Sequence, residues 1–154
     1  MFKQFNFPED LIDRYMEGEC HILTFALSRM VPSKTYVLRE IGIHDTSNGP
    51  ITYSLVVHSL VYLLDRNIFV DINGIFYSQQ AVIDFWIDNY TENDYRFGQF
   101  ILTEGEDITQ LEDFKHNLKA EDISDAKIYA KIILEQTPHD DVFVDEYNCD
   151  SGEK

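Results

Sequence analysis

The sequence contains few of the residues that build disulfide scaffolds, metal clusters or membrane segments. Its two cysteines, Cys20 and Cys149, stand far apart and fit neither a disulfide framework nor metal-ligand spacing, so we expect a reducing, cytoplasmic environment. No apolar run reaches the about 18 residues of a membrane span, and no basic region precedes an apolar run near the N-terminus, as a signal peptide requires. We therefore expect no membrane association.

Basic residues are scarce as well. The chain has 12 Lys and Arg against 28 Asp and Glu, and its formal net charge of −16 repels phosphate backbones and anionic lipids. Direct nucleic-acid binding is therefore disfavoured. Such a surface favours basic protein partners, can present carboxylates in a nucleic-acid channel of another protein, and also confers solubility.

Length and composition indicate one globular domain. The 154 residues are 44% hydrophobic and 14% aromatic, which suffices for one core without covalent staples. We predict a single α+β domain over residues 1–137, in which an antiparallel sheet packs against an N-terminal cysteine-bearing helix and further helices follow towards the C-terminus. Residues 138–154 form an acidic and flexible tail in this prediction, because few of them are apolar.

The first quarter of the chain predicts two helices. Pro8 followed by two acidic residues suits a first helical turn, and Gly18 ends that helix. Apolar residues then recur at helical spacing over 22–31 until Pro32. Cys20 is therefore expected in the first turn of a buried helix.

Later segments alternate between strand and helix patterns. Ser78 is a plausible N-cap for a helix that ends near Asn89. We also predict a strand over 35–43, a loop over 45–50, a strand over 97–103, and helices over about 107–119 and 124–136, the last with Ile128, Ile132 and Ile133 as its apolar face.

Residues 51–64 and 68–72 predict an antiparallel hairpin around a short polar turn, with His58 on its first strand and Asp71 on its second. If Asn67 pairs with Leu64, Asn73 stands opposite His58 and Asp71 is its diagonal neighbour on the same face. If the register slips by one residue, His58 and Asp71 point to opposite faces. The first register allows the two side chains to meet.

These residues are the types that thiol chemistry requires. A thiol reacts as its thiolate, which the unpaired N–H groups and the dipole of a first helical turn stabilise at Cys20. His58 would act as the base, and Asp71 would orient its ring, with Asn73 as an alternative acceptor. Gly18 permits the sharp turn into the helix, and the backbone N–H of Cys20 could serve an oxyanion hole. We therefore predict a catalytic set of Cys20, His58, Asp71 and Asn73.

This succession resembles the Cys, His, Asp core of the papain-like and transglutaminase-like superfamily. It runs from Gly18-Glu19-Cys20 at the start of a helix, through His58 on a strand, to Asp71-Ile72-Asn73-Gly74 on the next. It also resembles small uncharacterised phage and plasmid proteins with the same order of elements. The resemblance covers residues 10–90 and implies a cysteine helix against an antiparallel sheet, with peptidase, amidase, deamidase or acyl-transfer chemistry on a protein or peptide substrate.

Other assignments stay open at this stage. His21 adjoins Cys20 but should point elsewhere, because successive helical residues diverge by about 100°. His44 lies in the predicted loop and is a third candidate base.

We expect no metal and no cofactor, since no ligand spacing and no glycine-rich phosphate loop is present. The alternative function is a non-catalytic acidic binding protein, such as a phage-encoded inhibitor that blocks a basic nucleic-acid channel in a host defence complex, in the manner of an anti-CRISPR protein.

Overall fold

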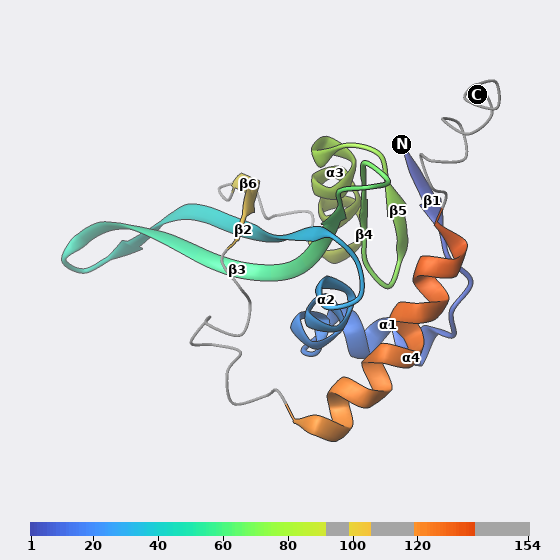
Figure 1. Cartoon of the computed structure of the whole chain (residues 1–154). Helices are drawn as coiled ribbons and strands as arrows, with labels where there is room; N and C mark the ends of the chain where they lie inside the picture. The colour runs from blue at the N-terminus through green and yellow to red at the C-terminus, as the bar shows by residue number, and fades with distance from the viewer. Residues whose placement is uncertain (92–98, 106–118, 138–154) are drawn as a thin grey trace.

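The computed structural model of the chain describes residues 1–91, 99–105 and 119–137. Within these residues the protein is an α+β fold, as predicted, with one antiparallel sheet of order β1-β5-β4-β3-β2-β6 (Figure 1). The strands are β1 Phe2–Gln4, β2 Ser33–Thr46, β3 Gly49–Leu63, β4 Ile68–Val70, β5 Gly74–Phe76 and β6 Gln99–Glu104. The helices are α1 Glu9–Met16, α2 Cys20–Ser28, α3 Gln79–Tyr90 and α4 Ala120–Gln136.

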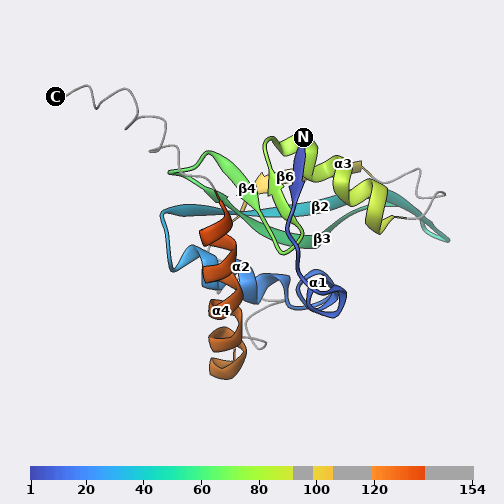
Figure 2. The same ribbon diagram turned by 90° about the vertical axis from the view of Figure 1, so that its right-hand side faces the viewer.

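Helices cover both faces of the sheet. Figures 1 and 2 show α1, α2 and α4 together on one side, whereas α3 lies on the other. Two core clusters correspond to these sides, and Trp86 of α3 packs against both of them. The helix that begins with Cys20 is buried over most of its length, because apolar residues face both the sheet and α4. No helix among the described residues is long and apolar enough to cross a membrane.

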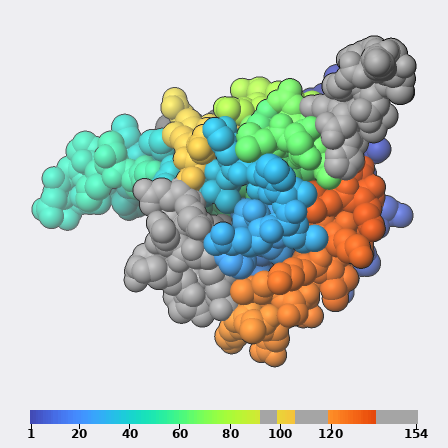
Figure 3. Space-filling model, viewed as in Figure 1, coloured from blue at the N-terminus to red at the C-terminus, as the bar shows by residue number. Residues whose placement is uncertain are grey.

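Strands β2 and β3 form a long hairpin whose outer part projects from the rest of the molecule (Figure 3). The pairing continues to Thr46 and Gly49, so the loop predicted over 45–50 is wrong except at its two central residues. A two-residue turn suffices because the Thr46 hydroxyl donates to the Gly49 carbonyl at 2.7 Å, and because Gly49 adopts a φ of 108° that favours glycine. The two strands therefore continue through residues whose composition is typical of loops.

A β-bulge interrupts this hairpin near the body of the protein. Leu38 pairs with His58, whereas the next residue, Arg39, pairs with Val56, so Val57 is the extra residue. The bulge shifts the alternation of β3 by one position. As a result, His58 and Leu55 lie on the same face of the sheet although they are three residues apart.

The hairpin of β3 and β4 has the first of the two predicted registers. Val61 pairs with Val70 and Leu63 pairs with Ile68, and extension of this pairing places residue 73 opposite residue 58. Asn67 occupies the turn with a φ of 58°. Strand β4 ends at Val70, so Asp71 follows it directly.

The helix predictions are largely confirmed. Ser78 caps α3 by accepting from the Ala81 N–H at 3.1 Å. Helix α4 begins earlier than predicted, and its buried residues are Ala126, Ala130 and Ile133, whereas Ile128 is 58% exposed. The face of α4 that packs on α2 therefore consists mainly of alanines and not of the predicted isoleucines. The helix predicted over 107–119 and the tail over 138–154 lie outside the described residues, apart from residue 119.

Candidate functional site

Cys20 is the first residue of α2 and is buried at the junction with α1. Gly18 makes the turn between the two helices with a φ of 151°, which side chains other than glycine rarely adopt. The following N–H, of Glu19, donates to the Arg14 carbonyl at 3.1 Å. The backbone N–H of Cys20 has no acceptor among the described residues, because first-turn N–H groups have no partner within their helix.

His58 and Asp71 form the second part of the site. The Nε2 atom of His58 lies 2.9 Å from Oδ2 of Asp71, and both side chains are buried. The other carboxylate oxygen, Oδ1, accepts the backbone N–H of Asn73 at 2.8 Å and that of Gly74 at 3.4 Å. Asp71 is therefore fixed by the turn that follows β4, and it fixes the orientation of the imidazole.

The remaining nitrogen of the ring is left for the sulfur of Cys20. Nδ1 of His58 is buried and makes no hydrogen bond of standard geometry to a described residue, and the thiol of Cys20 lies near enough to this ring to shift its pKa. Burial acts to lower the pKa of His58, but hydrogen bonds with Asp71 and Cys20 and the negative charges of both raise that pKa to about 10. The ring is therefore protonated at neutral pH.

The pKa of Cys20 is shifted in the opposite direction to that of His58. Burial acts to raise its pKa, but hydrogen bonds with His21 and His58, the charge of His58 and a hydrogen bond with Ser59 lower that pKa to about 5. A thiolate and an imidazolium therefore face each other at neutral pH. Both residues are buried, with Cys20 8% exposed and His58 1% exposed.

An aromatic wall closes the site on the side of α3. The Trp86 ring stacks on the His58 imidazole with centroids 5.5 Å apart, and Tyr90 stacks on Trp86 at 4.9 Å. A protonated imidazole is attracted to such a ring face. The side chain of Asn73 donates to the Tyr90 hydroxyl at 3.4 Å, so this amide supports the wall while its backbone N–H holds Asp71.

The three histidines considered from the sequence occupy different places. His58 faces both Cys20 and Asp71. His21 is buried and contributes to the lowered pKa of Cys20, although the sequence predicted that its side chain points elsewhere. His44 lies far out on the β2–β3 hairpin and is exposed.

Four contributors to the site were not predicted. Ser59, His21, Trp86 and Tyr90 act on the thiol, the imidazole or the turn that holds Asp71. The aromatic residues of α3 carried a sequence signal, since Trp86 and Tyr90 lie four apart and therefore on one helical face. Ser59 carried none, because nothing local distinguishes it from other polar residues of a strand.

A small polar hollow of about 280 Å³ adjoins the start of α2. It is lined by Gly18, Glu19, Ile22, Lys119 and Asp122. Among the described residues, no group of three or more His, Cys, Asp or Glu side chains is placed to hold a metal ion.

Comparison of the chain with models of protein families, with curated proteins and with solved structures finds no match.

Proposed function

We propose that the protein is a cysteine-dependent hydrolase or deamidase that acts on the amide bonds of a protein or peptide substrate. In this proposal Cys20 is the nucleophile, His58 the general acid and base, and Asp71 the residue that orients His58. The observation that supports it most is that the buried imidazole of His58 contacts a carboxylate through Nε2 and also lowers the pKa of the Cys20 thiol. A buried cysteine with a purely structural role would need neither an imidazole beside it nor a carboxylate that holds this imidazole.

The first half of the reaction uses the charged pair. The Cys20 thiolate attacks the carbonyl carbon of the amide, and the carbonyl oxygen gains the negative charge. The backbone N–H of Cys20 is free among the described residues to donate to that oxygen. The C–N bond then breaks as the His58 imidazolium gives its proton to the leaving nitrogen, which leaves a thioester on Cys20 and a neutral imidazole.

The second half restores the pair. The neutral His58 takes a proton from water, whose oxygen attacks the thioester carbon. The C–S bond breaks, the acid is released, and the thiolate and imidazolium form again. If an amine attacks in place of water, the same intermediate gives acyl transfer. If the leaving nitrogen is ammonia from a side-chain amide, the reaction is a deamidation.

The resemblance to the papain-like and transglutaminase-like superfamily supports this proposal. In the described structure the cysteine opens a helix, the histidine lies on a strand, and the aspartate directly follows the next strand, which is the order that the resemblance implies. A reducing compartment such as the cytoplasm would keep the Cys20 thiol available.

The test uses p-nitrophenyl acetate as a small acyl donor. We expect a burst of p-nitrophenolate equal to the amount of protein, an acetyl group on Cys20 detected by mass spectrometry, and slower turnover afterwards. Cys149→Ser is the matched control and should behave as the wild type, whereas Cys20→Ala should show neither burst nor acetylation. The absence of acylation at Cys20 in the folded wild-type protein would contradict the proposal.

A second candidate function is binding of a basic protein through the acidic surface. The observation that favours it is the net charge of −16, because the proposed thiol chemistry has no need of so many surplus acidic residues. Such binding should weaken steeply as ionic strength rises and should survive Cys20→Ala. A biological activity that is lost in Cys20→Ala with the fold retained would exclude it in favour of thiol chemistry.

A further inference from the structure

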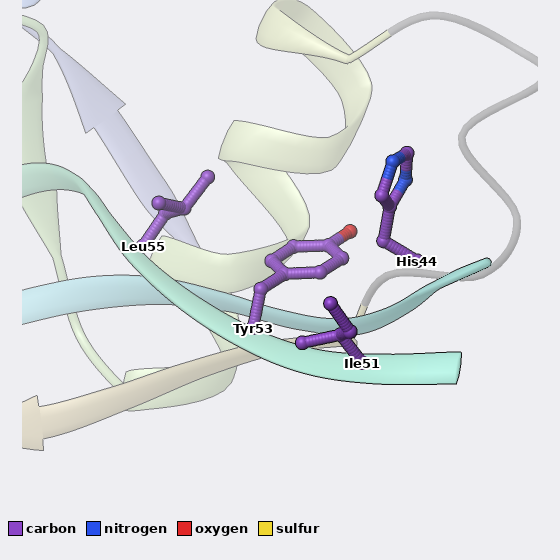
Figure 4. A pocket seen from close by; sticks show the side chains of 4 residues that line it. All are labelled: His44, Ile51, Tyr53 and Leu55. Atoms are coloured by element: carbon purple, nitrogen blue, oxygen red, sulfur yellow. The ribbon is translucent and has the colours of Figure 1, made fainter. Parts of the chain in front are cut away.

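The outer part of the β2–β3 hairpin, residues 39–56, carries an apolar hollow on one face. We call this part the arm. The hollow measures about 410 Å³ and is lined by His44, Ile51, Tyr53 and Leu55, whose side chains rise from the same side of the ribbon (Figure 4). Ile51 and Leu55 are 54% and 55% exposed. Because Ile51, Tyr53 and Leu55 alternate along β3, this row of side chains has the period of an extended chain.

The bulge makes this face continuous with the candidate site. On β2, Leu38 and Glu40 lie on one face, and their partners on β3 are His58 and Leu55. Tyr53 and Ile51 continue the same face because they pair with the next even-numbered residues of β2. The hollow and the imidazole therefore share one side of the sheet. Without the bulge, Leu55 and His58 would face opposite sides.

The floor of the hollow is fixed by specific contacts. The Tyr53 ring lies against Gly42, where a Cβ atom would come within 2.4 Å of the ring hydroxyl oxygen. The Tyr53 hydroxyl donates to Oε2 of Glu40 at 2.8 Å, and Glu40 is buried although it lies on a projecting hairpin. These contacts hold the ring flat on the strand.

Among the described residues, most of the edge of β3 beside this face has no paired strand. Strand β4 pairs with β3 only at Val61–Leu63, so no described strand covers that edge of β3 from Gly49 to Leu60. Strand β4 ends at Val70, and Asp71 comes next. A chain that continued the line of β4 along β3 would therefore have one end beside His58 and would place side chains next to Leu55, Tyr53 and Ile51.

Charge indicates the kind of chain that fits. The whole protein carries −16, the carboxylate of Glu40 lies on the same face as the hollow and accepts from Tyr53, and Asp13 and Glu17 interact electrostatically with Tyr90 at the aromatic wall. A positively charged segment is therefore attracted to this side of the molecule and a negatively charged one is repelled.

We propose that the arm binds an extended, basic peptide segment with an apolar side chain at every second position, which adds as a strand to the open edge of β3. This inference rests on the proposed function, for which it names the substrate class. The strand supplies main-chain hydrogen bonds, the hollow takes alternate apolar side chains, and the end of the segment beside His58 presents its peptide bond to Cys20.

The experiment measures binding in the Cys20→Ala variant of the full chain, where no turnover occurs. The probe is a fluorescein-labelled octapeptide of alternating lysine and valine, and binding is read by fluorescence anisotropy. We expect it to bind more tightly than a peptide of the same composition with all lysines before all valines. Methylation of alternate backbone nitrogens on the edge that faces β3 should abolish the binding.

A matched pair of variants locates the surface. Leu55→Ser should weaken binding of the alternating peptide about tenfold or more. Ile43→Ser should leave it unchanged, because Ile43 is 61% exposed on the same arm but pairs with Thr52 on the opposite face. Equal affinity for the two peptides, or equal effects of the two variants, would overturn the proposal. A dimer that depends on Leu55, seen by analytical ultracentrifugation without any peptide, would overturn it as well.

The outcomes separate the two proposals. Binding is measured without Cys20, so a failure of acyl chemistry does not alter it. Conversely, if the wild-type protein cleaves the alternating peptide with a KM that Leu55→Ser leaves unchanged, the arm proposal is refuted and the proposed hydrolase stands.

Discussion

Asp71 connects the backbone of a turn to the imidazole of His58 through its two carboxylate oxygens. Asp71→Asn keeps the size of the side chain but removes its charge, and its single amide oxygen cannot accept both from the turn and from the His58 ring, as the two oxygens of Asp71 do. We therefore expect the pKa of His58 to fall and the pKa of Cys20 to rise, because a neutral imidazole stabilises the thiolate less. The ultraviolet absorbance of the thiolate as a function of pH measures the second shift.

Asp88→Asn is the matched control for this titration. Asp88 is an exposed carboxylate of α3, and its replacement should leave the thiolate titration as in the wild type. An Asp71→Asn protein that titrates like Asp88→Asn would show that His58 is not held in its charged form by Asp71.

At this scale, sequence reasoning identified the residues with distinctive chemistry. Cys20, His58 and Asp71 could be selected because few side chains supply a nucleophile, a base and an orienting acid in that order of elements. His21 and Ser59 could not, since their contacts with the sulfur depend on the local path of a helical turn and on the approach of β3 to α2.

At the scale of elements, the β3–β4 hairpin decides whether the site exists. Its register could be reduced to two alternatives from the sequence, but only the structure selects the one in which Asp71 meets His58. The bulge at Val57 was not predictable, because no glycine or proline marks it. Neither were the three-residue strands β1 and β5, which form only because they pair with each other and β5 pairs with β4.

Arg66 links this hairpin to the end of α4. It lies in the β3–β4 turn, is 5% exposed, and donates to the Leu134 carbonyl at 3.1 Å and to the Thr137 hydroxyl. Arg66→Ala should lower the free energy of unfolding by about 1.5–3 kcal/mol, because charged hydrogen bonds to the helix end are lost.

Urea unfolding followed by circular dichroism measures the loss at Arg66. Arg39→Ala is the control, since Arg39 is a partly exposed arginine of β2 that should cost about 0.5 kcal/mol or less. Equal losses for the two variants would mean that α4 is not anchored through Arg66.

At the scale of the whole molecule, the charged pair makes stability depend on pH. Folding lowers the pKa of Cys20 from 9.0 to about 5, so its contribution is complete above pH 9 and is lost as pH falls through 5. Folding raises the pKa of His58 from 6.5 to about 10, so its contribution is complete below pH 6.5 and is lost as pH rises through 10. Together, the two groups make the free energy of unfolding increase as pH rises from 5 to 6.5. Their effects cancel from pH 6.5 to 9, and above pH 9 the free energy of unfolding decreases.

Comparison with Cys20→Ser isolates this dependence from the many surface carboxylates. The difference in free energy of unfolding between the wild type and this variant should rise as pH increases above 5 and fall again above 9. Urea titrations across this range provide the values. A difference that stays constant from pH 5 to 9 would mean that Cys20 does not ionise below its ordinary pKa in the folded protein.

The central claim is that Cys20 is a thiolate because His58, held by Asp71, faces it. The most direct measurement is the rate of alkylation of Cys20 by iodoacetamide as a function of pH, in a Cys149→Ser protein kept folded throughout. The rate should follow a single ionisation near pH 5. A rate that rises only near the ordinary thiol pKa, or a thiol that reacts only after unfolding, would contradict the account.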